Sequence, residues 1–347
     1  MWLLMKSYLE NRQQFVSGAG FSSDSANVDV GVPQGSVLGP LLFLIHINDI
    51  KEVSNLKTIN FADDTLLYNP FNNDASTESI EKVINTELGK VSKWLQENHL
   101  KLNTKKTKYM IFASEKSTWK NRRNMKIKIG QSEEIEKVDS YTYLGITIDS
   151  KLSWKPQINK LRTKLSQALG ILYRTRPYLN KSSLILLLNS LFMSHLRYGL
   201  ICWGRDALLE DDKMPKKLQP LQILLNKAMR CIYYRGPREN VDDLLKHNEI
   251  LRFKDMVKLE IGKFMYNYSN NLLPETFDHF FTNIRKTHSH DTRHANNNYC
   301  RPKKRTNNGL KTLSYLGAKT WAQIPDDLKA NTSTFSCTQK YKQILLE

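Results

Sequence analysis

Two adjacent acidic residues inside an apolar, β-prone run constrain this chain more than any other feature. The run from Ile59 to Tyr68 reads Ile-Asn-Phe-Ala-Asp-Asp-Thr-Leu-Leu-Tyr. Apolar residues on both sides of the pair predict a tight β-hairpin with Asp63 and Asp64 at its tip. Neighbouring carboxylates with no Lys or Arg nearby repel each other, and a divalent metal would offset that repulsion. A solvated turn is the alternative, because Asp is common in turns.

A loop punctuated by Gly and Pro precedes this hairpin. Residues 31–40 read Gly-Val-Pro-Gln-Gly-Ser-Val-Leu-Gly-Pro and lead into an apolar segment, 41–50, that predicts a buried helix. Glycine lets backbone approach a ligand closely, and Gln34 offers both a donor and an acceptor. The loop therefore predicts either a ligand-binding turn or an ordinary strand-to-helix connection.

The charge of the chain is unevenly distributed. Lys and Arg number 52 against 34 acidic residues, a formal net charge of +18. Residues 1–100 hold 7 basic and 12 acidic residues, net −5, so residues 101–347 hold 45 and 22, net +23. This excess predicts a polyanionic partner such as nucleic acid. A basic surface that only aids solubility needs less charge.

Composition argues against a secreted or membrane-spanning chain. The four cysteines have no paired spacing, which is typical of a reducing compartment. The most apolar stretch, Leu184–Trp203, is interrupted by Asn189, His195 and Arg197, which favours a buried helix over a membrane span. The first apolar residues are too few for a signal peptide. We expect an intracellular protein without a membrane partner.

Periodicity predicts mixed α and β structure up to residue 150. We expect a strand near 28–31 and an amphipathic helix over 76–98, capped by Ser76 or Thr77. The apolar stripe of this helix comprises Ile80, Val83, Ile84, Leu88, Val91 and Leu95. Further strands are predicted at 109–113, 126–130 and 141–149.

Helical patterns dominate after residue 150. Pro156 suits the first turn of a helix whose stripe contains Ile158, Leu161, Leu165, Leu169 and Leu172. Further helices are expected at 182–203 and 216–234, with two more in 240–270 that break near Ile250. Residues 285–309 are polar, Asn-rich and basic, which predicts a linker.

Four motifs in order resemble the reverse transcriptase of non-LTR (LINE-type) retrotransposons, the jockey-like group especially. They are the Gly-Val-Pro-Gln-Gly-Ser loop, Phe-Ala-Asp-Asp, Leu102-Asn103 with Lys106-Thr107, and Tyr143-Leu144-Gly145. The resemblance implies an α+β fold, a partial polymerase palm followed by a mainly helical thumb. The implied parts are a palm at 1–150, a thumb-like region at 151–239, a helical extension at 240–284, the linker at 285–309 and a C-terminal module at 310–347.

The resemblance also implies an activity, RNA-directed DNA polymerisation by two-metal nucleotidyl transfer. Asp63 would be the principal Mg²⁺ ligand and Asp64 a supporting one. The implied partners are an RNA template, a DNA primer or target and dNTPs, in a ribonucleoprotein of the nucleus and cytoplasm. The residues implied to lie against the templating base and the incoming nucleotide are Pro33, Gln34, Gly35, Ser36, Phe61 and Ala62.

Two other motifs would act on the reacting groups. Lys106 matches a lysine proposed to donate a proton to departing pyrophosphate, as a positioned lysine can. The alternative is a basic solvated turn, because four of residues 101–108 are Lys. Tyr143, Leu144 and Gly145 match the hairpin that grips the primer end, although a β-hairpin core aromatic fits the same pattern.

Aromatic residues interleaved with Arg in the helical region suit a thumb that holds a template–primer duplex. Individually, such residues are more often ordinary helix-face positions. The set comprises Tyr173, Arg174, Arg176, Tyr178, Arg230, Tyr233, Tyr234, Arg235 and Arg238.

One carboxylate of the family pattern has no counterpart. The family carries Asp-x-x-x-Ala-Phe-Asp upstream of the Gly-rich loop, and only Asp24 and Asp29 precede the loop here, neither in that context. We therefore expect a truncated or incomplete polymerase that lacks fingers and the preceding endonuclease. A two-metal site without this ligand should bind Mg²⁺ poorly.

Two other functions are compatible with the sequence. The first is a non-catalytic nucleic-acid-binding remnant, which would keep the basic region and its steep salt dependence. The second is an intron-encoded maturase, although nothing in the sequence suggests a splicing domain.

Two further motifs lie in the C-terminal part of the chain. His288, His290, His294 and Cys300 could bind zinc, although their spacing matches no standard finger. Trp321-Ala322-Gln323-Ile324-Pro325 with Leu328 resembles the closing module of the family.

Overall fold

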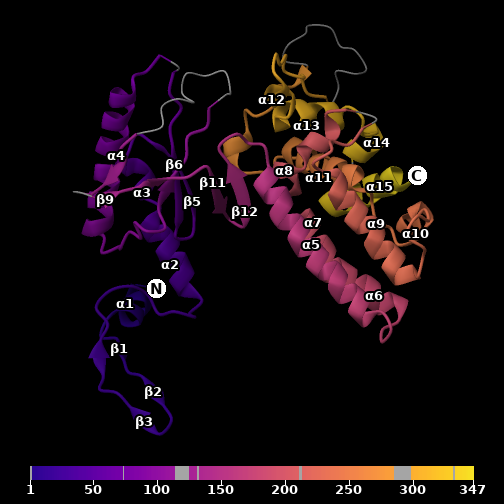
Figure 1. Ribbon diagram of the computed structural model, residues 1–347. Coiled ribbons are helices and arrows are strands. Elements are labelled where there is room, and N and C mark those ends of the chain that lie inside the picture. The colour runs from indigo at the N-terminus through magenta and orange to yellow at the C-terminus, as the bar shows by residue number, and fades with distance from the viewer. Residues whose placement is uncertain are drawn as a thin grey trace. The chain divides into compact units, whose positions relative to one another are not determined.

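The computed structural model describes residues 2–72, 74–113, 125–130, 133–210, 213–284, 298–330 and 333–347 (Figure 1). It divides into two compact units. The first unit comprises residues 1–141 and 150–152, and the second, which we call the helical unit, comprises 142–149 and 153–347. The fold is α+β, as predicted, with strands in the first unit and mostly helices in the second.

The first unit begins with a helix and two nested hairpins. Helix α1 (Trp2–Leu9) is followed by β1 (Gln13–Gln14), which pairs with β4 (Ala26–Asn27), and by β2 (Ser17–Gly18), which pairs with β3 (Phe21–Ser22). The strand predicted at 28–31 is wrong. Strand β4 ends earlier, and Gly31 has φ 86°, a left-handed conformation that extended strands do not use.

Short two-stranded sheets and a long helix make up the rest of this unit. The elements are α2 (Leu38–Ile47), α3 (Ile50–Val53), β5 (Lys57–Phe61), β6 (Asp64–Tyr68), α4 (Thr77–Glu97), β7 (Lys108–Tyr109), β8 (Lys128–Ile129), β9 (Glu133–Glu134) and β10 (Glu136–Lys137). Among the described residues, β5 pairs with β6 and β8 with β9, both antiparallel, while β7 and β10 are parallel. The strand predicted over 109–113 therefore ends at Tyr109.

Helix α4 supplies much of the core of the first unit. Its first backbone amides are capped by Ser76, whose hydroxyl accepts a hydrogen bond from Ser79 N. Ile80, Leu88 and Val91 are buried, as the stripe predicts. Val83, at the edge of this stripe, is exposed instead, and Glu87 is buried.

The helical unit begins with a hairpin and then folds around a single apolar core. The hairpin strands are β11 (Ser140–Tyr143), which crosses the division between the units, and β12 (Ile146–Asp149). The helices that follow are α5 (Lys155–Thr175), α6 (Lys181–Leu187), the π-helix η2 (Leu188–Met193), α7 (Ser194–Arg197), α8 (Leu200–Trp203), the 3₁₀ turn η3 (Arg205–Leu208), α9 (Gln219–Tyr233), α10 (Asp242–His247) and α11 (Phe253–Ser269). The predicted stripe of α5 is buried in this core.

The most apolar stretch of the chain contributes several side chains to this core, although others such as Leu186 are exposed. Leu188, Phe192, Leu196 and Trp203 are fully buried. Their helices are short, and none of the helices in the described segments is long and apolar enough to cross a bilayer.

The C-terminal helices complete the same core. After the 3₁₀ turn η4 (Glu275–Phe277) come α12 (Asn307–Leu310), α13 (Leu313–Trp321), α14 (Asp326–Lys329) and α15 (Thr334–Leu346). Helices α13 and α15 pack on α11 (Figure 1). A Cβ at Gly262 would lie 2.6 Å from Tyr341 Cε1, and one at Gly317 would lie 2.8 Å from Met265 Sδ. Glycine at these positions therefore lets the helices approach closely.

Candidate active site

The aspartate pair lies on the β5–β6 hairpin. Phe61 pairs with Asp64, so that only Ala62 and Asp63 form the turn. The prediction that both aspartates occupy the tip is thus wrong by one residue, because Asp64 is the first residue of β6. Ala62 has φ 51°, which a residue with a small side chain tolerates better than a bulky one.

Both carboxylates are available to bind a metal ion or a ligand. Asp63 and Asp64 are exposed, and neither makes a hydrogen bond or an ion pair with any described residue. Phe61 and Asp64 lie on the same face, because they are directly paired. Phe61 is 61% exposed, so an apolar surface borders the acidic groups.

A divalent metal fits this pair only as a partial ligand set. Among the described residues, no group of three or more acidic, His or Cys side chains is arranged to hold a metal ion. Mg²⁺ is commonly bound by one or two carboxylates together with waters and substrate phosphates. The unengaged carboxylates of Asp63 and Asp64 match that mode, in which the substrate completes the coordination shell.

Glu87 fastens this hairpin to α4, and the sequence analysis missed it. Its carboxylate accepts hydrogen bonds from Asn55 N at 2.7 Å and Ser54 Oγ at 3.0 Å, in the segment that leads into β5. Lys90 Nζ lies 2.7 Å from the same carboxylate. The hydrogen bond from Lys90, together with that from Asn55 N, lowers the pKa of Glu87 to about 2. The sequence did carry a signal for Glu87, because it is a charged residue at a position of the apolar stripe of α4.

Replacing Glu87 by Gln is expected to destabilise the first unit above pH 4.5 by about 2 kcal/mol, the scale of a hydrogen bond to a charged group. The pKa of Glu87 is lower in the folded state than its usual 4.5, so its contribution is complete above pH 4.5 and is lost as pH falls toward 2. Urea titrations across this pH range measure the effect. Glu97→Gln is the control, because Glu97 lies at the exposed end of α4. Equal effects of the two substitutions would contradict the assignment.

Ser36 holds the Gly-rich loop in place from inside. Its Oγ donates to Pro33 O at 2.7 Å, accepts from Gly39 N at 3.1 Å, and accepts from Tyr8 Oη. Gln34 and Gly35 are exposed, and Gly35 has φ 79°. A Cβ on Gly39 would lie 3.0 Å from Pro33 O, so the loop requires glycine there. The loop presents Gln34 outward while Ser36 supports it.

Lys106 is exposed in a turn stabilised by Asn103. Its backbone N donates to Asn103 Oδ1 at 3.1 Å, and its carbonyl accepts from Tyr141 Oη at 3.2 Å. No hydrogen bond or ion pair in the described part of the chain joins the Lys106 side chain to Asp63 or Asp64. The structure therefore leaves its predicted role untested.

The Tyr143-Leu144-Gly145 motif forms the turn of the β11–β12 hairpin. Leu144 and Gly145 have φ 45° and 79°, as a two-residue type I′ turn requires. Tyr198 Oη donates to Leu144 O at 2.7 Å, and a Cβ on Gly145 would lie 3.2 Å from Tyr198 Cε1. Residues 142–149 thus belong to the helical unit, whereas the sequence analysis placed them with the palm.

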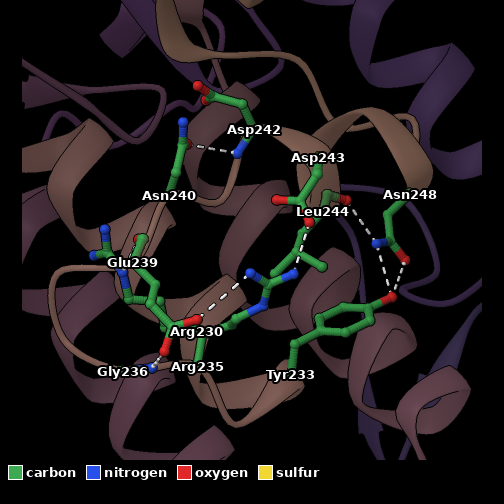
Figure 2. A network of polar contacts seen from close by, with 10 residues as sticks. All are labelled: Arg230, Tyr233, Arg235, Gly236, Glu239, Asn240, Asp242, Asp243, Leu244 and Asn248. Atoms are coloured by element: carbon green, nitrogen blue, oxygen red, sulfur yellow. Dashed lines mark hydrogen bonds and ion pairs between the residues drawn. The ribbon is translucent and has the colours of Figure 1, made fainter.

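The region rich in Arg and Tyr divides into two parts in the structure. One part is internally neutralised, as Figure 2 shows. Arg235 pairs with Glu239 at 3.4 Å and with Asp243 at 2.7 Å, and Arg230 Nε donates to Glu239 O at 2.8 Å. The other part surrounds Arg176, which contacts tyrosine rings instead of carboxylates.

The proposed zinc ligands are not assessed by this structure. His288, His290 and His294 lie outside the described residues, and only Cys300 lies within them.

Comparisons with known proteins agree with the motifs. Residues 4–148 match the family model described as reverse transcriptase (RNA-dependent DNA polymerase). Through these residues, the chain resembles the reverse-transcriptase family. The match includes the Gly-rich loop, the aspartate pair and Tyr143-Leu144-Gly145.

Curated relatives are polymerases of mobile elements. The chain is 27% identical over 237 residues to the probable RNA-directed DNA polymerase from transposon X-element of Drosophila melanogaster, covering 66% of this chain and 24% of that protein. It is 26% identical over 261 residues to the RNA-directed DNA polymerase from mobile element jockey of the same species, covering 70% and 26%. These matches confirm the resemblance to jockey-like reverse transcriptases. The chain spans about a quarter of the length of both relatives. No solved structure is detectably similar to it.

Proposed function

We propose that this chain carries out, or forms part of a protein that carries out, RNA-directed DNA polymerisation for a jockey-like non-LTR retrotransposon. The observation that carries the proposal is the exposed, unengaged aspartate pair within residues matched to the reverse-transcriptase family. In this reaction a primer 3′-hydroxyl attacks the α-phosphate of a dNTP, and pyrophosphate leaves. The proposed partners are an RNA template, a DNA primer or target and dNTPs.

Asp63 and Asp64 would hold Mg²⁺, Asp63 as principal ligand. Bound there, the metal supplies charge stabilisation to the attacking and leaving oxygens. Pro33, Gln34, Gly35 and Ser36 would position the templating base and nucleotide, and Ser36 would do so by keeping the loop rigid. Phe61 offers an apolar surface beside the acidic pair, and the small Ala62 leaves room for the primer end.

Lys106 would donate a proton to departing pyrophosphate. Tyr143, Leu144 and Gly145 would hold the primer end, with Tyr198 as the residue that fixes their turn. The proposed setting is a ribonucleoprotein of the nucleus and cytoplasm.

The exposed face of α5 suits the phosphate backbones of a template–primer duplex. From residue 150 to residue 205 the chain has no Asp or Glu and ten Lys or Arg. Lys155, Arg162 and Lys164 are exposed on α5 and have no carboxylate partner among the described residues. Unneutralised cations along one helix bind phosphate with little sequence preference.

A second candidate function is nucleic-acid binding without turnover. It is favoured by the observation that, in the described segments, no third carboxylate joins Asp63 and Asp64. The basic surface of the helical unit would serve this function without the aspartate pair.

Primer extension separates the two candidates. The purified chain is incubated with a labelled DNA primer on an RNA template, dNTPs and Mg²⁺. Polymerisation predicts template-dependent extension that stops when EDTA removes the metal. No extension, together with salt-sensitive RNA binding, would favour the second candidate.

A further inference from the structure

The ends of α5 and α9 are joined by a stack of two tyrosines around one arginine. Arg176 Cζ lies 4.3 Å from the ring centroid of Tyr234 and 5.6 Å from that of Tyr173. Tyr234 Oη donates to Arg176 O at 2.9 Å, and Arg176 Nη1 donates to Cys231 O at 3.4 Å. The hydrogen bonds fix the orientation of the guanidinium and of the Tyr234 ring.

The stack remains open to solvent. Tyr173 is 47% exposed and Tyr234 is 58% exposed. Tyr178, two residues beyond Arg176, is 86% exposed, and its side chain makes no hydrogen bond or ring contact with any described residue. Contacts with Arg176 account for the position of the Tyr234 ring, whereas no contact within the described residues accounts for the position of the Tyr178 ring. Three tyrosines exposed within one short region form an unusual surface for a chain in solution.

The cations that neighbour these tyrosines in the sequence are not neutralised. Arg174, Arg176 and Lys181 have no carboxylate partner among the described residues, and Lys181 Nζ lies 5.2 Å from the ring centroid of Tyr233. The acidic residues that follow α9 are engaged elsewhere, since Glu239 and Asp243 pair with Arg235 (Figure 2). The patch is therefore positive as well as aromatic.

We propose that Tyr173, Arg174, Arg176, Tyr178, Lys181 and Tyr234 form a binding platform for single-stranded nucleic acid. Exposed aromatic faces stack on unpaired bases, and fixed cations bind the intervening phosphates. Bases of a duplex are already stacked on one another, so their faces are not available to these rings. Since stacking does not involve the 2′-hydroxyl, single-stranded RNA and DNA should bind alike. This platform goes beyond the proposed polymerase chemistry, because it requires neither Asp63 nor Asp64.

Fluorescence anisotropy with a labelled, unstructured pyrimidine oligonucleotide tests the platform in the whole chain, without metal or dNTPs. Replacing Tyr173 and Tyr178 together by Ala is expected to weaken binding of single-stranded RNA and DNA about tenfold for each tyrosine. The double replacement by Phe keeps the rings and should retain the affinity. Binding to an RNA–DNA duplex should stay unchanged in both variants.

Phe335→Ala is the matched control, because Phe335 is an exposed aromatic residue on another helix of the same unit. Circular dichroism verifies that each variant is folded. Three outcomes would overturn the proposal: full single-strand affinity in the Ala variant, equal loss in the Phe variant, or loss confined to the duplex. An Asp63→Asn, Asp64→Asn chain should bind the oligonucleotide normally, so failure of the polymerase proposal leaves this test intact.

Discussion

Replacing Asp63 by Asn is expected to slow template-directed nucleotide incorporation about a thousandfold. A metal that stabilises the reacting oxygens supplies several kcal/mol, and each 1.4 kcal/mol corresponds to a factor of about ten in rate. Asn keeps the size of the side chain but removes the charge that binds the cation. Asp64→Asn should have a smaller effect, because Asp64 is proposed as the supporting ligand.

The structure indicates that this loss of rate can be measured separately from any loss of folding. Neither carboxylate bonds to any described residue, so both variants should fold as the unsubstituted chain does. Single-nucleotide extension gives the rate, and electron paramagnetic resonance of Mn²⁺ gives metal binding independently. Asp74→Asn is the control, since Asp74 is also exposed and precedes α4. Unchanged extension and unchanged Mn²⁺ binding in Asp63→Asn would refute the assignment.

Replacing Trp321 by Ala is expected to lower the free energy of unfolding of the helical unit by about 3–5 kcal/mol. Trp321 on α13 is fully buried in the core that also contains Ile261 and Met265 of α11. Removing the indole leaves a cavity that neighbouring side chains fill only in part. The loss would be a large fraction of the stability of an ordinary domain.

Urea unfolding followed by far-ultraviolet circular dichroism measures this change, because most helices lie in the helical unit. Trp321→Phe should cost less, since it retains an aromatic ring. Phe335→Ala should change stability by no more than about 0.5 kcal/mol, as exposed substitutions do. If Trp321→Ala were as mild as Phe335→Ala, α13 could not be part of the core.

Local patterns in the sequence predicted much of the fold. The Asp-Asp pair between apolar runs predicted the β5–β6 hairpin, although its turn lies one residue earlier, and the stripe around Leu161 and Leu165 predicted α5 and its buried face. Pro156 and Ser76 correctly indicated where two helices begin. These features depend on residues only a few positions apart, so periodicity reports them directly.

Contacts between distant residues were not predictable in the same way. Glu87 is buried because Ser54 and Asn55 bond to it, and no pattern within α4 indicates those partners. Tyr198 contacts Gly145 across the hairpin turn, although the sequence separates them by a whole helical region. Sequence motifs therefore named the candidate site residues, whereas the side chains that support them emerged only from tertiary structure.

The close seating of α15 on α11 has a consequence for how the chain is made on the ribosome. Helix α11 ends at Ser269 and α15 at Leu346, so the surface that Tyr341 covers on α11 is synthesised well before its cover. At a synthesis rate of about 5–20 residues per second, that interval is roughly 4–15 s. During this time the nascent chain exposes apolar surface around Gly262, where chaperones that hold unfinished proteins would bind.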